Sequence, residues 1–119
     1  MRTFRALTLT AALAAGCLGL TAPAQAATTP DCPQATICLW YGENYSGERV
    51  VWSRGNALVF QAFRHHVGSF VANVDGCFVR YDADGRIVEG RVAHPGDRRA
   101  NYLSAFGSRM EGIANLVEC

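Results

Sequence analysis

Residues 37–47 constrain the possible fold more than any other stretch of the chain, because they predict a strand that runs into a tight hairpin. β-Branched, aromatic and other apolar side chains follow one another along the first half: Ile37, Cys38, Leu39, Trp40 and Tyr41. Alternation at a period of two in such a segment is typical of a half-buried strand. Four residues separate Trp40 from Tyr45, and Gly47 follows at plus two, so one ring can cover the turn while Gly47 adopts a positive φ.

This pattern of aromatic residues and glycine resembles the signature hairpin of the β/γ-crystallin Greek key. Residues 38–41 and 44–49 are similar to a secreted bacterial branch of that superfamily, the peptidase-inhibitor family typified by the actinomycete metalloproteinase inhibitor. The resemblance implies an all-β fold in which two Greek-key motifs form a β/γ-crystallin-like sandwich. It also implies structural roles in the first motif for four residues: Trp40, Tyr45, Gly47 and Ser69. In crystallin-type motifs the serine hydrogen-bonds back to the folded hairpin.

An internal repeat indicates a chain built from two similar units of about 40 residues. Residues 71–74 match residues 113–116 at an offset of 42, and residues 40–47 have a weaker counterpart in residues 78–85 at an offset of 38. Short strands separated by turn signals predict a two-sheet sandwich to which each half contributes four strands. The last of these strands is expected to run into Cys119.

Residues 1–26 have the features of a secretory signal peptide. Arg2 and Arg5 form a positive n-region, residues 6–20 are apolar, and residues 24–26 provide a small-x-small cleavage site. These features predict that the protein is exported and that the leader is removed.

Removal of the leader leaves residues 27–119, which we expect to form one small domain. No further apolar run in them is long enough to span a bilayer, so we expect the mature protein to be extracellular and not bound to a membrane. A rival interpretation is a lipoprotein that is processed and lipidated at Cys17. Secretion is favoured because Leu13 lies one place too early for the usual large apolar residue and apolar sequence continues past Cys17.

The charge balance argues against one class of partner. The whole chain contains 11 basic and 10 acidic residues, and loss of Arg2 and Arg5 with the leader makes the mature domain nearly neutral. A nucleic-acid binder would normally show a basic stripe, so nucleic acid is not an expected partner.

Four cysteines remain after removal of the leader: Cys32, Cys38, Cys77 and Cys119. An even number of cysteines in a short exported chain predicts two disulfides. Three pairings are possible. The spacing favours Cys32 with Cys38, at the entrance to the first strand, and Cys77 with Cys119, which ties the first strand of the second half to the C-terminus. A zinc site is disfavoured because the chain has no Cys-x-x-Cys knuckle and the compartment is oxidising.

We expect no metal and no cofactor. Many crystallin-type domains bind calcium through an Asn or Asp pair followed by a Ser or Thr and a second Ser, but here His65 and His66 replace the acidic pair and Phe70 replaces the last serine. The second half departs too, with residues 107–108 and 111–112 at the equivalent positions. A transition metal on His65 and His66 is disfavoured because adjacent side chains on a strand point to opposite faces.

The chain lacks the usual sequence signatures of an enzyme. It has no His-Glu-x-x-His motif and no phosphate-cradling glycine loop, and its cysteines are expected to be oxidised. Asp82 and Asp84 flank an alanine before Gly85, a pattern typical of a turn rather than of a catalytic carboxylate pair. A non-enzymatic binding function is therefore favoured.

The family resemblance implies a secreted inhibitor of an extracellular metalloprotease, acting as a monomer that presents a rigid β-strand loop to the protease cleft. In the family the reactive strand lies in the second half beside a cysteine. The matching residues here are Cys77, Phe78 and Val79, with Phe78 as the apolar anchor. The family's inhibitor braces this loop with a second nearby cysteine, which this chain lacks before Cys119. Phe78 and Val79 also fit buried strand positions.

The alternative function is a non-inhibitory structural or interaction protein of the cell envelope that uses the crystallin-type scaffold. Binding to a protease would separate the two hypotheses.

Overall fold

Short strands make up almost all of the regular structure in the part of the chain that the computed structural model describes, residues 30–55 and 57–119. In chain order the elements are β1 (Thr36–Trp40), β2 (Arg49–Ser53), β3 (Leu58–Val59), β4 (Ser69–Ala72), β5 (Gly76–Tyr81), β6 (Ile87–Ala93), β7 (Arg98–Arg99), the 3-10 turn η1 (Phe106–Ser108), β8 (Gly112–Ala114) and the 3-10 turn η2 (Leu116–Glu118). The predicted signal peptide, residues 1–26, lies outside the described residues. Among those that are described, no helix is long and apolar enough to cross a membrane.

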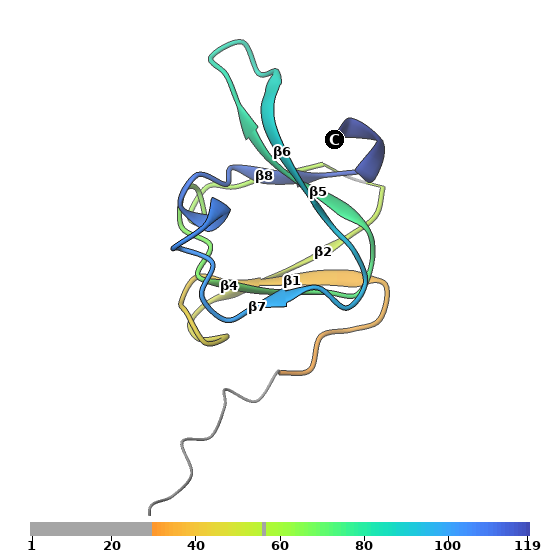
Figure 1. Ribbon diagram of the computed structural model, residues 1–119, viewed down its shortest axis with the longest axis vertical. Helices are drawn as coiled ribbons and strands as arrows, with labels where there is room; N and C mark the ends of the chain where they lie inside the picture. Colours follow the sequence, from red (N-terminus) through yellow and green to blue (C-terminus); the bar gives the residue numbers. More distant parts are fainter. Residues whose placement is uncertain (1–29, 56) are drawn as a thin grey trace, which may run out of the picture.

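The strands form two antiparallel four-stranded sheets that face each other across the core (Figure 1). Sheet A has the strand order β2-β1-β4-β7, and sheet B has the order β3-β8-β5-β6. Each half of the chain contributes three strands to one sheet and one strand, β3 or β7, to the other. The prediction of an all-β sandwich is confirmed, and the assignment of Greek-key connections stays a prediction.

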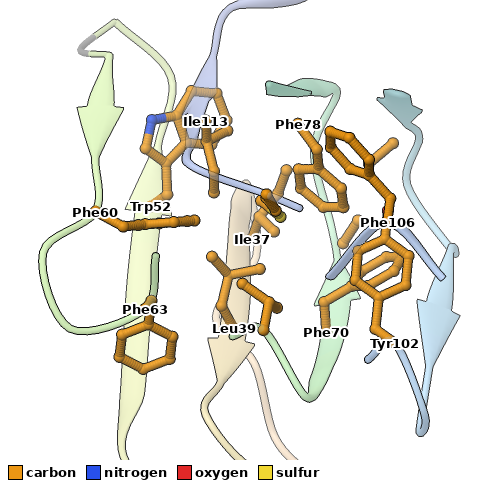
Figure 2. Close-up of a cluster of buried hydrophobic side chains, with 14 of the residues drawn as sticks. Ile37, Leu39, Trp52, Phe60, Phe63, Phe70, Phe78, Tyr102, Phe106 and Ile113 are labelled. Carbon is orange, nitrogen blue, oxygen red and sulfur yellow. The ribbon is translucent and has the colours of Figure 1, made fainter. Parts of the chain in front are cut away.

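Apolar side chains from both sheets fill the space between them (Figure 2). Side chains point in at a period of two, as Ile37 and Leu39 of β1 do. Phe70, Phe78 and Tyr102 pack edge to face, with ring centroids 4.8 to 5.9 Å apart. Because Phe70 lies on β4 and Phe78 on β5, these rings join the two sheets at their centre.

Both faces of β1 are buried, so the prediction of a half-buried strand is wrong. Cys38 and Trp40 point away from the main core, and Cys32 and Tyr45 pack over them. The rings of Trp40 and Tyr45 meet edge to face at 5.4 Å. The outer face of sheet A is thus covered by the segments that precede and follow β1, which the alternation within β1 does not reveal.

Both predicted disulfides are confirmed. Cys32 is bonded to Cys38, and Cys77 is bonded to Cys119. Cys77 lies on the outer face of the central strand β5, and its bond to Cys119 holds the C-terminal turn η2 against that strand. Each disulfide therefore covers the outer face of a central strand, β1 in sheet A and β5 in sheet B.

Strand pairing shows which residues of the two halves are equivalent. The sequence offset between equivalent residues differs by one from the offset predicted from the internal repeat. Cys38 pairs with Val71 in sheet A, and Cys77 pairs with Ala114 in sheet B. The offset is 39 residues from Cys38 to Cys77 and 43 residues from Val71 to Ala114. The predicted offsets of 38 and 42 are wrong, because a slip of one residue would match core-facing positions with outward-facing ones.

The chain also ends differently from the prediction. β8 stops at Ala114, and the last residues before Cys119 form η2 rather than a strand. The disulfide explains the difference, because it draws the C-terminus across the outer face of sheet B toward Cys77 instead of along the direction of β8.

Candidate functional site

The three residues predicted as the reactive site, Cys77, Phe78 and Val79, are consecutive in β5, and their side chains are only 0%, 1% and 0% exposed. Phe78 points into the core, where its ring lies 5.0 Å from that of Phe70 (Figure 2). Cys77 and Val79 point to the opposite face, beneath Tyr81. In this conformation the three side chains lie beneath the surface of the protein and are not part of that surface.

Past its buried part, β5 leaves the body of the sandwich and becomes one arm of the β5–β6 hairpin, which projects beyond sheet B in Figure 1. The turn that joins the arms, residues 82–86, is exposed, and we call it the hairpin tip. Asp82 Oδ1 accepts hydrogen bonds from the backbone N–H groups of Asp84 and Arg86, both at 2.9 Å. Gly85 has a positive φ of 76°, which a side chain would strain. The hairpin tip is therefore exposed and internally fixed.

Glu111 holds the base of this hairpin. Its carboxylate accepts the backbone N–H of Tyr81 at 3.0 Å and the Nε–H of Arg64 at 2.7 Å, and His65 Nε2 lies 3.3 Å away. Burial alone would raise the pKa of Glu111, but the hydrogen bonds from Arg64 and Tyr81 lower it below its ordinary value. One ionised carboxylate thus joins the first arm of the hairpin to the loop that carries Arg64 and His65.

The hairpin between β1 and β2 is folded over and held by Ser69, which is fully buried. Ser69 Oγ accepts the backbone N–H of Tyr45 at 2.9 Å and donates to the carbonyl of Gly42 at 2.7 Å. Asn44, Tyr45 and Gly47 have positive φ values of 54°, 58° and 81°. The side chain of one residue on β4 therefore satisfies the backbone of a turn distant in sequence.

The β5–β6 hairpin has no such serine. Ser69 pairs with Trp40 in sheet A, and the corresponding pair in sheet B is Gly112 with Val79. Because Gly112 has no hydroxyl to bond the turn, nothing at this position ties the second hairpin down onto sheet B. The hairpin extends outward instead, and its base is held by Glu111.

At β6, one carboxylate is bound by three arginines. Glu89 accepts hydrogen bonds from Arg109 Nη2 at 3.1 Å, from Arg80 Nε at 3.1 Å and from Arg91 Nη2 at 2.7 Å. The hydrogen bonds from Arg109 and Arg80 lower the pKa of Glu89 to about 2. The carboxylate is therefore ionised at neutral pH, and it orders the three guanidinium groups around it.

Sequence reasoning missed both Glu89 and Glu111. A signal for Glu89 existed, because Arg91 lies two positions away on the same strand face and such charge alternation is typical of cross-strand ion pairs. Arg80 is indeed the residue paired with Glu89 across the hairpin. No local pattern could have predicted the contact between Glu111 and Tyr81, because this contact depends on how β8 lies beside β5.

His65 and His66 have different partners. His65 lies beside Glu111, whereas the ring of His66 stacks on that of Tyr41 with centroids 3.8 Å apart. His66 Nδ1 also lies 2.9 Å from the carbonyl oxygen of Tyr41. Within residues 30–55 and 57–119, no three His, Cys, Asp or Glu side chains form a group that could hold a metal ion.

A family model matches residues 25–93, a span that contains both hairpins and ends with β6, and its description is peptidase inhibitor family I36. The chain belongs to peptidase inhibitor family I36. Membership confirms the inhibitor family suggested by the first hairpin. Because family I36 consists of peptidase inhibitors and not of enzymes, the partner that it implies is a protease. The two disulfides fit a secreted member of the family.

Similar proteins are found in Dictyostelium discoideum. An uncharacterized gerABC family protein is 39% identical over 92 residues, which cover 76% of this chain and 78% of that protein. A second uncharacterized gerABC family protein is 29% identical over 87 residues, or 71% of this chain and 47% of that protein. Spore germination protein 1 is 32% identical over 85 residues, or 68% of this chain and 64% of that protein. No solved structure matches this I36 chain.

Proposed function

We propose that residues 27–119 form a secreted, monomeric inhibitor of an extracellular metalloproteinase and that this inhibitor presents the β5–β6 hairpin to the protease cleft. The inhibitor role follows from family I36. The metalloproteinase class rests on the resemblance of the first hairpin to the actinomycete metalloproteinase inhibitor. The observation that carries the mode of binding is the projection of an exposed, internally hydrogen-bonded hairpin from a disulfide-braced sandwich (Figure 1).

Rigidity favours this hairpin as the contact element. Binding costs less conformational entropy when a loop is already ordered, and the hydrogen bonds of Asp82 order the hairpin tip in the free protein. β6 is also an edge strand of sheet B, with no strand on its outer side in the described part of the chain. Edge strands pair readily with extended polypeptide, which is one way in which a protease cleft could engage the hairpin.

Cys77, Phe78 and Val79 have a supporting role in this proposal. Phe78 anchors β5 in the core, and Cys77 links it to Cys119, so the arm that leaves the sandwich starts from a fixed base. The same strand that the sequence suggested as the reactive segment thus carries the contact surface a few residues further on, at the hairpin tip.

The test is a titration of the secreted, disulfide-bonded chain against a thermolysin-like metalloprotease and a subtilisin-like serine protease, with residual activity as the readout. We expect near-stoichiometric inhibition of the metalloprotease. Asp82→Ala removes both side-chain hydrogen bonds of the hairpin tip, and we expect it to weaken inhibition about tenfold, the equivalent of about 1.4 kcal/mol of lost preorganisation.

Asp97→Ala is the matched control. Asp97 is an exposed aspartate in a different turn, and its Oδ2 accepts the backbone N–H of His94 at 2.8 Å. Loss of this turn contact should leave inhibition unchanged if the hairpin tip makes the contact. Equal weakening by both substitutions would contradict the proposed mode of binding.

The alternative, a non-inhibitory structural or interaction protein of the cell envelope, draws some support from the names of the Dictyostelium relatives, which refer to spore germination. If neither protease is inhibited at micromolar concentration while the domain is folded, this alternative replaces the inhibitor proposal.

A further inference from the structure

A groove of about 350 Å³ lies between the edge strands of the two sheets, β6 of sheet B and β7 of sheet A. Its floor is aromatic, formed by Phe70, Tyr102 and Phe106, each of which is at most 6% exposed. Its sides carry Arg91 from β6 and Arg98 and Arg99 from β7. Arg109 joins them from the segment after η1, because its guanidinium lies over the Phe106 ring. We call this surface the arginine groove.

Positive charge is concentrated around this groove although the mature domain is nearly neutral. Four of the nine arginines that follow residue 26 line or border it: Arg91, Arg98, Arg99 and Arg109. Of the ten acidic residues, Asp97 lines the groove, Glu89 binds Arg91 and Arg109, and Glu111 lines a neighbouring hollow together with Arg109. The cluster therefore keeps an excess of positive charge, and mutual repulsion makes such an arrangement unfavourable for folding by itself.

The guanidinium groups are held in place before any ligand binds. Arg91 and Arg109 lie over the Phe106 ring at 5.1 and 5.5 Å, and both donate to Glu89. One carboxylate cannot occupy all the N–H donors of its arginines, since each guanidinium carries five. Arg99 is exposed, lines the groove and, within the described residues, forms no ion pair.

Tyr102 forms part of the floor of the groove that Arg91 and Arg99 also line. Burial raises the pKa of Tyr102 to about 12, and the positive charges of Arg91, Arg99 and Arg109 oppose that rise. Arg91 of β6, Arg99 of β7 and Arg109 after η1 come from different segments of the chain and surround the same aromatic floor. They form one site rather than a scatter of surface charges.

The chemistry of the groove favours an anionic polysaccharide over other polyanions. Guanidinium forks bind sulfate and carboxylate groups through paired hydrogen bonds. Single-stranded nucleic acid is usually held by stacking of bases on exposed aromatic rings, but Phe106 and Tyr102 are only 4% and 6% exposed. A protein partner would need an apolar centre, and Val92 is the main exposed apolar side chain that lines the groove.

We propose that the arginine groove binds the sulfate or carboxylate groups of an extended anionic polysaccharide. This site lies between β6 and β7, away from the hairpin tip, and the proposal does not depend on protease inhibition. It gives the protein a second surface, by which it could be retained on an acidic glycan matrix.

The experiment measures binding of the secreted, disulfide-bonded chain to heparin, to polygalacturonate and to single-stranded DNA by calorimetry at low and at physiological salt. We expect salt-dependent binding to heparin, polygalacturonate or both. Binding to heparin alone identifies sulfate as the recognised group, and binding to polygalacturonate alone identifies carboxylate. Either result supports the proposal.

The Arg98→Glu, Arg99→Glu double variant reverses two charges on the short, exposed strand β7, and we expect glycan affinity to fall at least about tenfold with a shallower salt dependence. The Arg49→Glu, Arg54→Glu double variant is the matched control, because both residues are exposed, Arg49 lies on β2 at the opposite edge of the same sheet, and Arg54 lies in the turn that follows β2. It should change glycan affinity less than about twofold. Thermal unfolding verifies that both variants are folded.

Three results would overturn the proposal. They are absence of binding to either glycan at low salt, equal loss of affinity in the two double variants, and binding of single-stranded DNA as tight as that of the glycans and lost in the same variant.

Discussion

The buried hydroxyl of Ser69 accepts the backbone N–H of Tyr45, 24 residues earlier in the chain, at 2.9 Å. The same hydroxyl donates to the carbonyl of Gly42. One side chain therefore satisfies both a donor and an acceptor of the folded first hairpin. Its removal leaves two backbone groups without their partner, which is more costly than loss of a solvent-exposed hydrogen bond.

We predict that Ser69→Ala lowers the free energy of unfolding by about 1–3 kcal/mol. Ser104→Ala is a suitable control, because the Ser104 hydroxyl is exposed and donates only at 3.4 Å. It should change stability by less than about 0.5 kcal/mol. Denaturant unfolding of both variants checks the prediction, and equal effects would show that Ser69 does not hold the hairpin.

The two disulfides should differ in their contributions to stability. Cys77 and Cys119 are 42 residues apart, whereas Cys32 and Cys38 are six apart. In the chain-entropy model the longer loop contributes about 4 kcal/mol and the shorter about 2 kcal/mol. Paired cysteine-to-alanine variants, compared by denaturant unfolding, should show the larger loss for the pair Cys77 and Cys119. The reverse order would mean that native contacts, rather than loop closure, govern these bonds.

Phe78 should act through the core. Phe78→Ala is expected to destabilise the domain by about 3–5 kcal/mol, because the ring is 1% exposed and packs between the sheets. Phe78→Leu keeps most of the volume, so we expect it to remain folded and to inhibit the protease as the unchanged chain does. Thermal unfolding and the inhibition titration together test this. A folded Phe78→Leu variant without inhibition would instead place the protease contact at Phe78.

Acid should weaken the ion-pair network at Glu89. The fold lowers the pKa of this carboxyl from 4.5 to about 2, so ionised Glu89 stabilises the protein above pH 4.5, and this contribution is lost as the pH falls toward 2. Glu89→Gln removes the titrating group. We therefore expect the Tm of the variant to fall less steeply across this pH range, and to be lower than that of the unchanged chain at neutral pH. Parallel Tm curves would contradict the prediction.

Local patterns predicted the parts of the fold that depend on neighbours in sequence. The turn residues of the first hairpin and the short spacing from Cys32 to Cys38 act over a few positions, and each was predicted correctly as a turn or a bond. The repeat was recognised, but its register was misplaced by one residue. A short match such as residues 71–74 with 113–116 shows only that similar residue types recur. The alignment of the strands is set instead by which face of each strand is buried.

Burial was the property that local patterns predicted least well. Cys38 and Trp40 alternate with core residues and would be exposed on an isolated sheet, but Cys32 and Tyr45 cover them. The sequence left Phe78 open between a reactive site and a buried strand position, and the contacts with Phe70 and Tyr102 show that its ring lies inside the core. What covers a strand face depends on distant segments, which periodicity within the strand cannot encode.

The sequence by itself determined the all-β class, the folded first hairpin, the inhibitor family and an even set of cysteines, because these depend on residue types at short, fixed spacings. Only the tertiary structure decided that the second hairpin projects and that Glu111 holds its base. It also decided that Arg109 joins Arg91 at Glu89. The physical reason is the same in each case: these contacts arise from the packing of strands far apart in the chain, and a side chain acquires its charge environment and its exposure only when those strands meet.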